Sequence, residues 1–172
     1  MRNLTRHNRD IVKPLDEFPS QTFLDVRIQL FQLIVAVLEQ TGAASVRIAT
    51  FSSSEEFLLR MLKLRERGLV TFASLLTDNK SIYKTLSLHH LMTQAYDEVL
   101  IAPNHSKFVL VQNERHKVAI VTSQNQTRGD RLELSYISTD AQQFDDIAAG
   151  LSRATAGARH IDSILRKRDN GD

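Results

Sequence analysis

The stretch EVLIAPNHSKFVLVQNERHKVAIVTSQN, residues 98–125, decides the fold of this chain. It contains three short apolar runs, at residues 99–102, 108–111 and 118–121, and each run is flanked by polar residues or proline. Short apolar runs of this kind are typical of buried β-strands. Polar residues 113–116 separate the last two runs and predict the turn of a β-hairpin.

Polar side chains able to do chemistry flank this predicted hairpin. His105 and Lys107 stand at alternate positions where the second run begins, so they face the same side of a strand. Ser123 and Asn125 follow the third run. Because a hairpin returns the end of its second strand beside the start of its first, the four side chains should converge. A nucleophile or base, a fixed cation, a hydroxyl and an amide in one cluster suit a tetrahedral phosphate anion.

Outside the hairpin, helical and strand patterns alternate along the chain. Further strands are predicted at Ser45–Phe51, Leu69–Leu76, Glu98–Ala102 and Leu132–Ile137. Helices are predicted at Thr22–Gln40, from the Ser54 cap to Gly68, at Ser81–Tyr96 and from Asp140 toward Arg168. The strand–helix–strand order of residues 45–76 is a βαβ unit, whose strands should be parallel. The expected fold class is α/β, with a mixed β-sheet flanked by helices on both faces.

Length and composition predict one domain with a sizeable core. We place this domain at residues 21–168, after a basic N-terminal arm at 1–20 and before a disordered tail at 169–172. The 172 residues include no cysteine, which excludes disulfides, cysteine nucleophiles and thiolate metal sites. The formal net charge is only +2, but basic residues gather at both ends of the chain. Basic ends can attract a polyanion, and they can equally serve only as solvated, solubilising termini.

The apolar segments are too short to span a membrane. The longest, Phe31–Leu38, has less than half the length that a bilayer requires. The N-terminal residues are polar and basic, and no apolar stretch follows them as in a signal peptide. We therefore expect a cytoplasmic protein with no membrane insertion.

The polar residues of the hairpin resemble the signature of the phospholipase D superfamily. That signature is His-x-Lys, four residues, Asp, and then Gly-Ser-x-Asn, often with a Glu downstream. His105 and Lys107 match its first unit. Residues 122–125, Thr-Ser-Gln-Asn, match the second unit with Thr in place of Gly. Glu133 stands where the supporting carboxylate is expected, so the resemblance implies a phospholipase D-like domain.

The resemblance implies a metal-independent phosphodiesterase that needs no cofactor. His105 is implied as the nucleophile that forms a phosphohistidine. Lys107, Ser123 and Asn125 are implied to hold the phosphate oxygens, and Glu133 to orient a histidine. The family mechanism uses two histidines, but this chain has one His-x-Lys unit. The resemblance therefore implies a two-fold homodimer with the active site at its interface.

The chain departs from the signature at two positions. Gln112 stands at the Asp position and cannot supply a negative charge. Thr122 adds a side chain where Gly permits close approach of the backbone. Either departure is compatible with lower activity or with a descendant that only binds its ligand.

Other conspicuous residues are interpreted as structural. His89 and His90 are adjacent and point in different directions on a helix, so they make a poor metal pair. His116 lies in the predicted turn, and Arg128-Gly129-Asp130 is interpreted as another turn. The sequence shows no phosphate-binding glycine loop and no dense set of carboxylates for magnesium.

Three functions remain open at the level of sequence. The first is a nuclease acting on DNA or RNA, preferred because the termini are basic and no amphipathic membrane element is evident. The second is a catalytically weak or inactive module that binds nucleic-acid phosphates, which Gln112 favours. The third is a phospholipid-processing enzyme.

Overall fold

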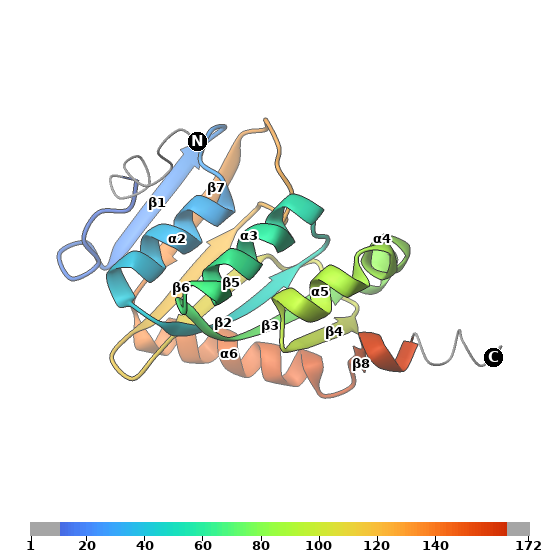
Figure 1. Ribbon diagram of the computed structural model, residues 1–172. Coiled ribbons are helices and arrows are strands. Elements are labelled where there is room, and N and C mark those ends of the chain that lie inside the picture. Colours follow the sequence, from blue (N-terminus) through green and yellow to red (C-terminus); the bar gives the residue numbers. More distant parts are fainter. Residues whose placement is uncertain (1–10, 165–172) are drawn as a thin grey trace.

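An eight-stranded mixed β-sheet forms the centre of the protein (Figure 1). The computed structural model describes residues 11–164, apart from the side chains of residues 82, 84 and 85. The strand order is β1-β7-β6-β5-β2-β3-β4-β8. Strands β2, β3 and β4 are mutually parallel, and the other neighbours are antiparallel. The strands are β1 (Ser20–Asp25), β2 (Ala44–Thr50), β3 (Val70–Asp78), β4 (Glu98–Ala102), β5 (Phe108–Gln112), β6 (Lys117–Thr122), β7 (Glu133–Ser138) and β8 (Arg159–His160).

Helices cover both faces of this sheet. The helices are α2 (Leu30–Thr41), α3 (Glu55–Glu66), α4 (Ile82–Ser87), α5 (His89–Ala95) and α6 (Ala141–Thr155), with a 3₁₀ turn at Asn79–Ser81. Helices α2, α3 and α5 lie on one face, and α6 lies on the other (Figure 1). The predicted fold class, α/β with a mixed sheet flanked by helices on both faces, is confirmed.

Two hydrophobic cores fill the space between the sheet and its helices. Alternate residues of a strand point to opposite faces, and β5 illustrates this rule. Val109 and Val111 join the core beneath α2 and α3, whereas Leu110 packs with Phe144 of α6. All four side chains are fully or almost fully buried. The central strands are therefore fixed in register from both sides.

The predicted βαβ unit is present as β2, α3 and β3. The side chain of Ser54 accepts a hydrogen bond from the backbone nitrogen of Phe57, so Ser54 caps α3 as expected. Gly68 follows the helix with a φ of +70°, a conformation that glycine adopts without strain. Strands β2 and β3 pair in parallel, as the order of the elements predicted.

An ion pair fixes this unit to β4. Asp97 accepts hydrogen bonds from Arg65 Nη1 at 2.6 Å and Arg65 Nη2 at 2.7 Å, and from the backbone nitrogen of Ala73 at 2.8 Å. The Arg65 guanidinium holds the pKa of the Asp97 carboxyl below its usual value. The pair thereby connects α3 with the start of β4 and with β3.

The prediction of a helix at Thr22–Gln40 is wrong at its N-terminal end. Residues 20–25 form β1, which pairs antiparallel with β7, and helix α2 begins only at Leu30. Phe23 fits the helical spacing of the later apolar residues by coincidence. The side chains of Gln29 and Gln32 form a capping box that starts α2 after the strand has ended.

Two other helix predictions are wrong in extent. The helix expected at Ser81–Tyr96 is broken into α4 and α5, which meet at Leu88. The helix expected from Asp140 toward Arg168 ends at Thr155, after which β8 pairs with β4. Gly157 disfavours continuation of the helix. The residues after it instead form backbone hydrogen bonds as β8, which pairs with β4.

Several predictions concern residues outside the described range. Residues 1–10 of the proposed arm, residues 165–168 of the last helix and the proposed tail at 169–172 lie there. Val12 and Leu15, in the second half of the proposed arm, are buried in the larger core. Within residues 11–164, none of the helices combines the length and the apolar character needed to cross a membrane.

Candidate active site

The β5–β6 hairpin brings the two halves of the sequence motif together. Phe108 of β5 pairs with Val121 of β6, and the backbone nitrogen of Thr122 donates to the carbonyl oxygen of Lys107 at 3.0 Å. The end of β6 therefore lies beside the start of β5. This is the arrangement that the turn at residues 113–116 predicted.

One groove of about 1010 Å³ opens at this edge of the sheet. Five of the residues singled out from the sequence line it: His105, Lys107, Ser123, Asn125 and Glu133. Phe108, Val121, Ile147 and Leu151 form much of its apolar wall. The convergence of polar side chains is thus present in the structure, on a groove formed partly by α6.

His105 lies in the loop between β4 and β5 and is exposed. Its ring meets the ring of Phe51 edge-on, with the centroids 5.9 Å apart. Lys107 immediately precedes β5, and its Nζ donates to the carbonyl oxygen of His105 at 2.8 Å. Both residues therefore precede the strand, which begins at Phe108, although they line the same groove.

Buried polar contacts fix the loop that carries His105. The backbone nitrogen of Asn104 donates to Asp78 Oδ2 at 2.7 Å, and Asn104 Nδ2 donates to the carbonyl oxygen of Thr50 at 3.0 Å. Asn104 Oδ1 accepts from the backbone nitrogen of Ser106 at 3.1 Å. Because Thr50 and Asp78 end β2 and β3, these contacts hold His105 against two strands of the sheet.

Ser123 and Glu133 contact each other directly. Ser123 Oγ donates a short hydrogen bond to Glu133 Oε2 and accepts one from the backbone nitrogen of Leu134 at 3.0 Å. The predicted contact between Glu133 and a histidine ring is absent from the described residues. Glu133 instead fixes the hydroxyl of Ser123 on the groove.

Asn125 presents its amide group between two loops. Its Oδ1 accepts from the backbone nitrogen of Phe51 at 3.2 Å and from Thr50 Oγ1 at 3.4 Å. Within residues 11–164 the NH₂ group of Asn125 has no partner, so it can donate to a ligand in the groove. Phosphate oxygens accept such hydrogen bonds.

Two buried glutamines hold the backbone on either side of Asn125. Gln124 Oε1 accepts from the backbone nitrogen of Leu30, at the start of α2, at 2.8 Å. Gln126 Nε2 donates to Tyr96 Oη at 2.9 Å, while its Oε1 accepts from Ser53 Oγ at 2.5 Å. Burial raises the pKa of Tyr96, which keeps the phenol neutral. Alternation along residues 123–126 thus sends Ser123 and Asn125 to the groove and both glutamines inward.

The two departures from the signature have different positions. Gln112 lies at the far end of β5, about 13 Å along the strand from Phe108, where its Oε1 accepts from Arg47 Nη2 at 3.5 Å. It is outside the groove. Thr122 is buried; its Oγ1 contacts Ser135 Oγ at 2.8 Å and accepts from the backbone nitrogen of Gln124 at 3.0 Å. Its hydroxyl therefore stabilises the turn that carries Ser123 and Asn125.

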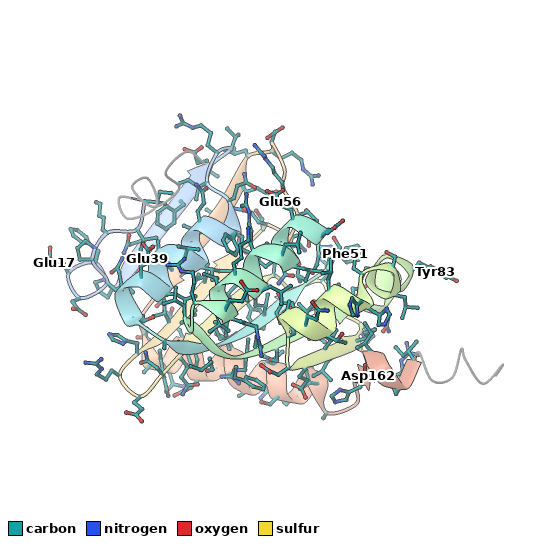
Figure 2. All side chains as sticks on the ribbon, viewed as in Figure 1. Glu17, Glu39, Phe51, Glu56, Tyr83 and Asp162 are labelled. Atoms are coloured by element: carbon teal, nitrogen blue, oxygen red, sulfur yellow. The ribbon has the colours of Figure 1, made fainter. Side chains whose placement is uncertain are left out.

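Two groove residues were missed at the level of sequence. Phe51 follows β2 and lies at the carboxyl-terminal edge of the parallel strands (Figure 2). Arg131, in the loop before β7, adds a second permanent cation to the groove beside Lys107. The basic pair Arg128 and Arg131 soon after the motif was the available signal for this loop. No sequence pattern linked Phe51 to a hairpin more than fifty residues away.

The described residues offer no metal centre of the usual kind. In the range 11–164 there is no group of three or more histidine and carboxylate side chains able to hold a metal ion. The permanent cations of the groove are Lys107 and Arg131, against the carboxylate of Glu133. The arrangement can therefore attract an anion and place it beside an exposed imidazole.

Several solved structures share this fold, and one of them is described as a phospholipase D family member. Nuc from Salmonella typhimurium, described as a phospholipase D family member, superposes with a TM-score of 0.64 at 14% identity, over 82% of this chain and 96% of Nuc. NucT from Helicobacter pylori gives 0.63 at 11% identity, over 83% and 98% of the two chains. Phosphatidylserine synthase from Haemophilus influenzae gives 0.54 at 14% identity, over 83% of this chain and 39% of the synthase.

Comparison of the sequence alone gives no relatives: it matches no protein-family model and no curated protein. At identities this low, the superpositions show the fold and nothing finer. The mixed sheet with helices on both faces is therefore phospholipase D-like, as the resemblance of the motif implied.

Proposed function

We propose that the protein is a metal-independent phosphodiesterase that cleaves nucleic acid through a phosphohistidine at His105. The observation that carries this proposal is the meeting of His105, Lys107, Ser123 and Asn125 on one groove of a phospholipase D-like fold. Gln112, the departure that favoured a module without activity, lies outside that groove. The groove itself carries a candidate nucleophile, a cation and hydrogen-bond donors for a phosphate.

The first chemical step is displacement at phosphorus. A ring nitrogen of neutral His105 attacks, an N–P bond forms, and the P–O bond to the leaving group breaks. Lys107 and the amide of Asn125 hold the phosphate oxygens, and Ser123 joins them when its O–H turns from Glu133 to a phosphate oxygen. These groups favour the transition state because its charge develops on the oxygens that they face.

The leaving oxygen requires a proton, which we assign to His105 of the partner subunit in a two-fold homodimer. Water then attacks the phosphohistidine and returns a proton to that second histidine. The N–P bond breaks, and His105 becomes free again. This cycle requires the two grooves to face each other across the two-fold axis.

An exposed apolar strip beside the groove supports such a dimer. Leu24 of β1 and Leu134 of β7 are directly opposite each other and remain 64% and 49% exposed. Leu132 and Val121 extend this surface, and both also line the groove. Contiguous apolar surface of this kind favours association with another protein surface. An interface over this strip would place two copies of the groove close together.

The volume of the groove favours a polymeric substrate. At about 1010 Å³ it greatly exceeds the space that a single phosphodiester group fills, so nucleotides can lie on both sides of the scissile phosphate. Nucleic acid also suits the permanent cations of the groove. We therefore prefer a nuclease to a phospholipid-processing enzyme.

The deciding experiment compares wild type with His105→Asn in the presence of EDTA. The substrates are bis(4-nitrophenyl) phosphate, plasmid DNA and single-stranded oligonucleotides. Wild type should cleave at least one of them without added metal, and His105→Asn should lower kcat by about a thousandfold or more with little change in substrate binding. Equal activity of the two proteins on every substrate would remove the enzymatic proposal, and rescue by magnesium after EDTA would remove metal independence.

A further inference from the structure

A second groove adjoins the first. Its volume is about 330 Å³, and it lies between the start of α2, the start of α3 and the loop that follows β6. Three arginines line it, Arg27, Arg60 and Arg128, together with two carboxylates. Asn125 lines both grooves. A chain bound at the candidate active site can therefore continue past Asn125 into the second groove.

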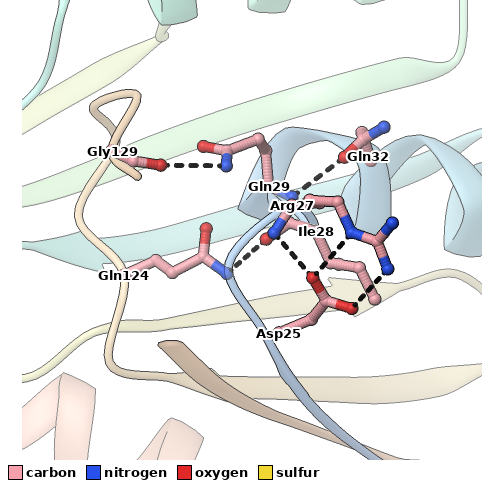
Figure 3. A network of polar contacts seen from close by, with 7 residues as sticks. All are labelled: Asp25, Arg27, Ile28, Gln29, Gln32, Gln124 and Gly129. Carbon is pink, nitrogen blue, oxygen red and sulfur yellow. Dashed lines mark hydrogen bonds and ion pairs between the residues drawn. The ribbon is translucent and has the colours of Figure 1, made fainter. Parts of the chain in front are cut away.

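Polar contacts hold the wall that carries Arg128. Gln29 Nε2 donates to the carbonyl oxygen of Gly129 at 3.2 Å, and Gln124 Nε2 donates to the carbonyl oxygen of Ile28 at 2.9 Å (Figure 3). These bonds fix the loop after β6 against the segment that leads into α2. The Arg-Gly-Asp stretch at residues 128–130, interpreted from the sequence as a turn, is thus part of a built groove.

The three guanidinium groups differ in how firmly they are paired. Arg60 Nη2 lies 2.6 Å from Glu56 Oε1, and its guanidinium lies 5.5 Å from the centroid of the Phe31 ring, so Arg60 forms a fixed wall. Glu56 stands at the start of α3 (Figure 2). This pairing leaves the other two arginines as the candidate ligands for an anion.

Arg27 and Arg128 are the more available cations. Arg27 Nε donates to Asp25 Oδ1 and Arg27 Nη2 donates to Asp25 Oδ2, each at 3.4 Å (Figure 3). The side chain of Arg27 is 86% exposed. An exposed pair of that kind contributes little and exchanges readily for a better anion. Arg128 makes no side-chain hydrogen bond or ion pair anywhere in residues 11–164. A guanidinium offers a planar fork of donors that fits two phosphate oxygens.

We propose that this second groove binds a phosphate that neighbours the scissile one in the same nucleic-acid strand, with Arg27 and Arg128 as its ligands. The proposal rests on the proposed function, because the active-site groove defines the scissile position. Two adjacent anion-binding grooves that share Asn125 can both be filled by one ligand only if that ligand carries repeated phosphates. A phosphodiester lipid of the ordinary kind carries only one such group in its headgroup, so a nucleic-acid strand fits better.

The first test measures binding of a fluorescein-labelled single-stranded 12-mer by anisotropy at several salt concentrations. Arg27→Ser/Arg128→Ser is compared with Arg67→Ser/Arg115→Ser, which removes two exposed arginines outside both grooves. All proteins carry His105→Asn so that the probe stays intact. The first pair should weaken binding about 10-fold and lower the salt slope by about 0.7, since one neutralised phosphate on a single strand contributes about 0.7. The control pair should change affinity less than twofold.

The second test measures cleavage in the background with His105 intact. The ratio of kcat/KM for the 12-mer to kcat/KM for bis(4-nitrophenyl) phosphate should fall about 10-fold in Arg27→Ser/Arg128→Ser, because the small substrate has no neighbouring phosphate. Equal loss on both substrates would overturn the separate subsite.

The outcomes separate this inference from the proposed function. A wild-type protein that binds the 12-mer but cuts nothing rejects the enzyme, while the binding comparison still decides the groove. Equal weakening by the two arginine pairs, or no binding of the 12-mer at low salt, rejects the groove. The Arg27→Ser/Arg128→Ser variant is also compared with wild type on vesicles of anionic phospholipid. If this variant binds the vesicles more weakly than wild type but binds the 12-mer equally well, the groove binds a lipid surface and the proposal fails.

Discussion

The Nζ atom of Lys107 donates a hydrogen bond to the backbone carbonyl oxygen of His105, 2.8 Å away. The cation of the motif therefore lies against the backbone of the proposed nucleophile, on the groove that both residues line. A phosphate that approaches His105 meets this ammonium group and can attract it away from the carbonyl. The lysine is thus available to bind the anion and, before that, to brace the loop.

Lys107→Ala should weaken substrate binding and slow turnover together, because a charge that holds phosphate acts in both the ground state and the transition state. We expect a rise in KM and a fall in kcat of about 10-fold or more each. Lys107→Arg should recover binding better than turnover, since the charge remains while the geometry changes. Steady-state kinetics on an oligonucleotide checks this expectation. An unchanged KM in Lys107→Ala would contradict a role in binding phosphate.

Glu133→Ala should lower kcat by about 10-fold, because the Ser123 hydroxyl loses the carboxylate that orients it. Glu133→Gln keeps an acceptor and should recover part of the loss. Stability should hold or rise slightly, because Glu133 lies directly opposite Asp25 across β1 and β7 and like charges there are unfavourable. Asp145→Asn, which alters a carboxylate paired with Lys117 outside the groove, is the matched control. A full loss of activity in the control, or none in Glu133→Ala, would count against the assignment.

Leu134→Glu should convert a dimer to a monomer, because it places a charge on the exposed strip that contains Leu24. Light scattering at micromolar concentration should give wild type twice the monomer mass and the variant the monomer mass. Leu59→Glu alters a leucine of similar exposure, 43%, on α3 and should leave the dimer intact. A monomeric wild type would exclude the proposed shared active site.

Asp97→Asn should lower the free energy of unfolding at pH 7 by about 1 kcal/mol. The loss is small because solvent partly screens the ion pair between Asp97 and Arg65, whose side chains are both partly exposed. The pKa of Asp97 is lowered in the folded protein, so its contribution is present above the unfolded pKa of about 4 and is lost as pH falls through the folded pKa. Urea denaturation of both proteins should therefore show a difference at pH 7 that shrinks at pH 3. Asp16→Asn serves as a control for the removal of an exposed carboxylate. A difference that grows on acidification would contradict this linkage.

The central strands could be predicted from the sequence because their evidence is local. The runs that became β4, β5 and β6 are apolar on both sides, and a polar turn separates the last two. Their order alone then placed His105 and Lys107 beside Ser123 and Asn125. No long-range information was needed for that part of the site.

The predictions that were wrong concern elements whose partners are far away in the sequence. Strand β1 exists through its ladder with β7, more than a hundred residues later, and local spacing of Phe23 and Leu30 imitated a helix. The contact between Glu133 and Ser123 was likewise not visible in local patterns, because it depends on how β7 meets the end of β6. The second groove escaped prediction for the same reason, since its arginines come from three separate segments.

The hairpin turn lies far enough from the candidate active site that its length can change without altering the site. Asn113 anchors the turn, because its Nδ2 donates a hydrogen bond to the carbonyl oxygen of Thr41 at 2.9 Å. Glu114 and Arg115, at the tip of the turn, are exposed. The turn lies at the opposite end of β5 and β6 from His105. Residues can therefore be inserted between Glu114 and Arg115 without moving either half of the motif. The tip is therefore the place to attach a fluorophore or peptide tag.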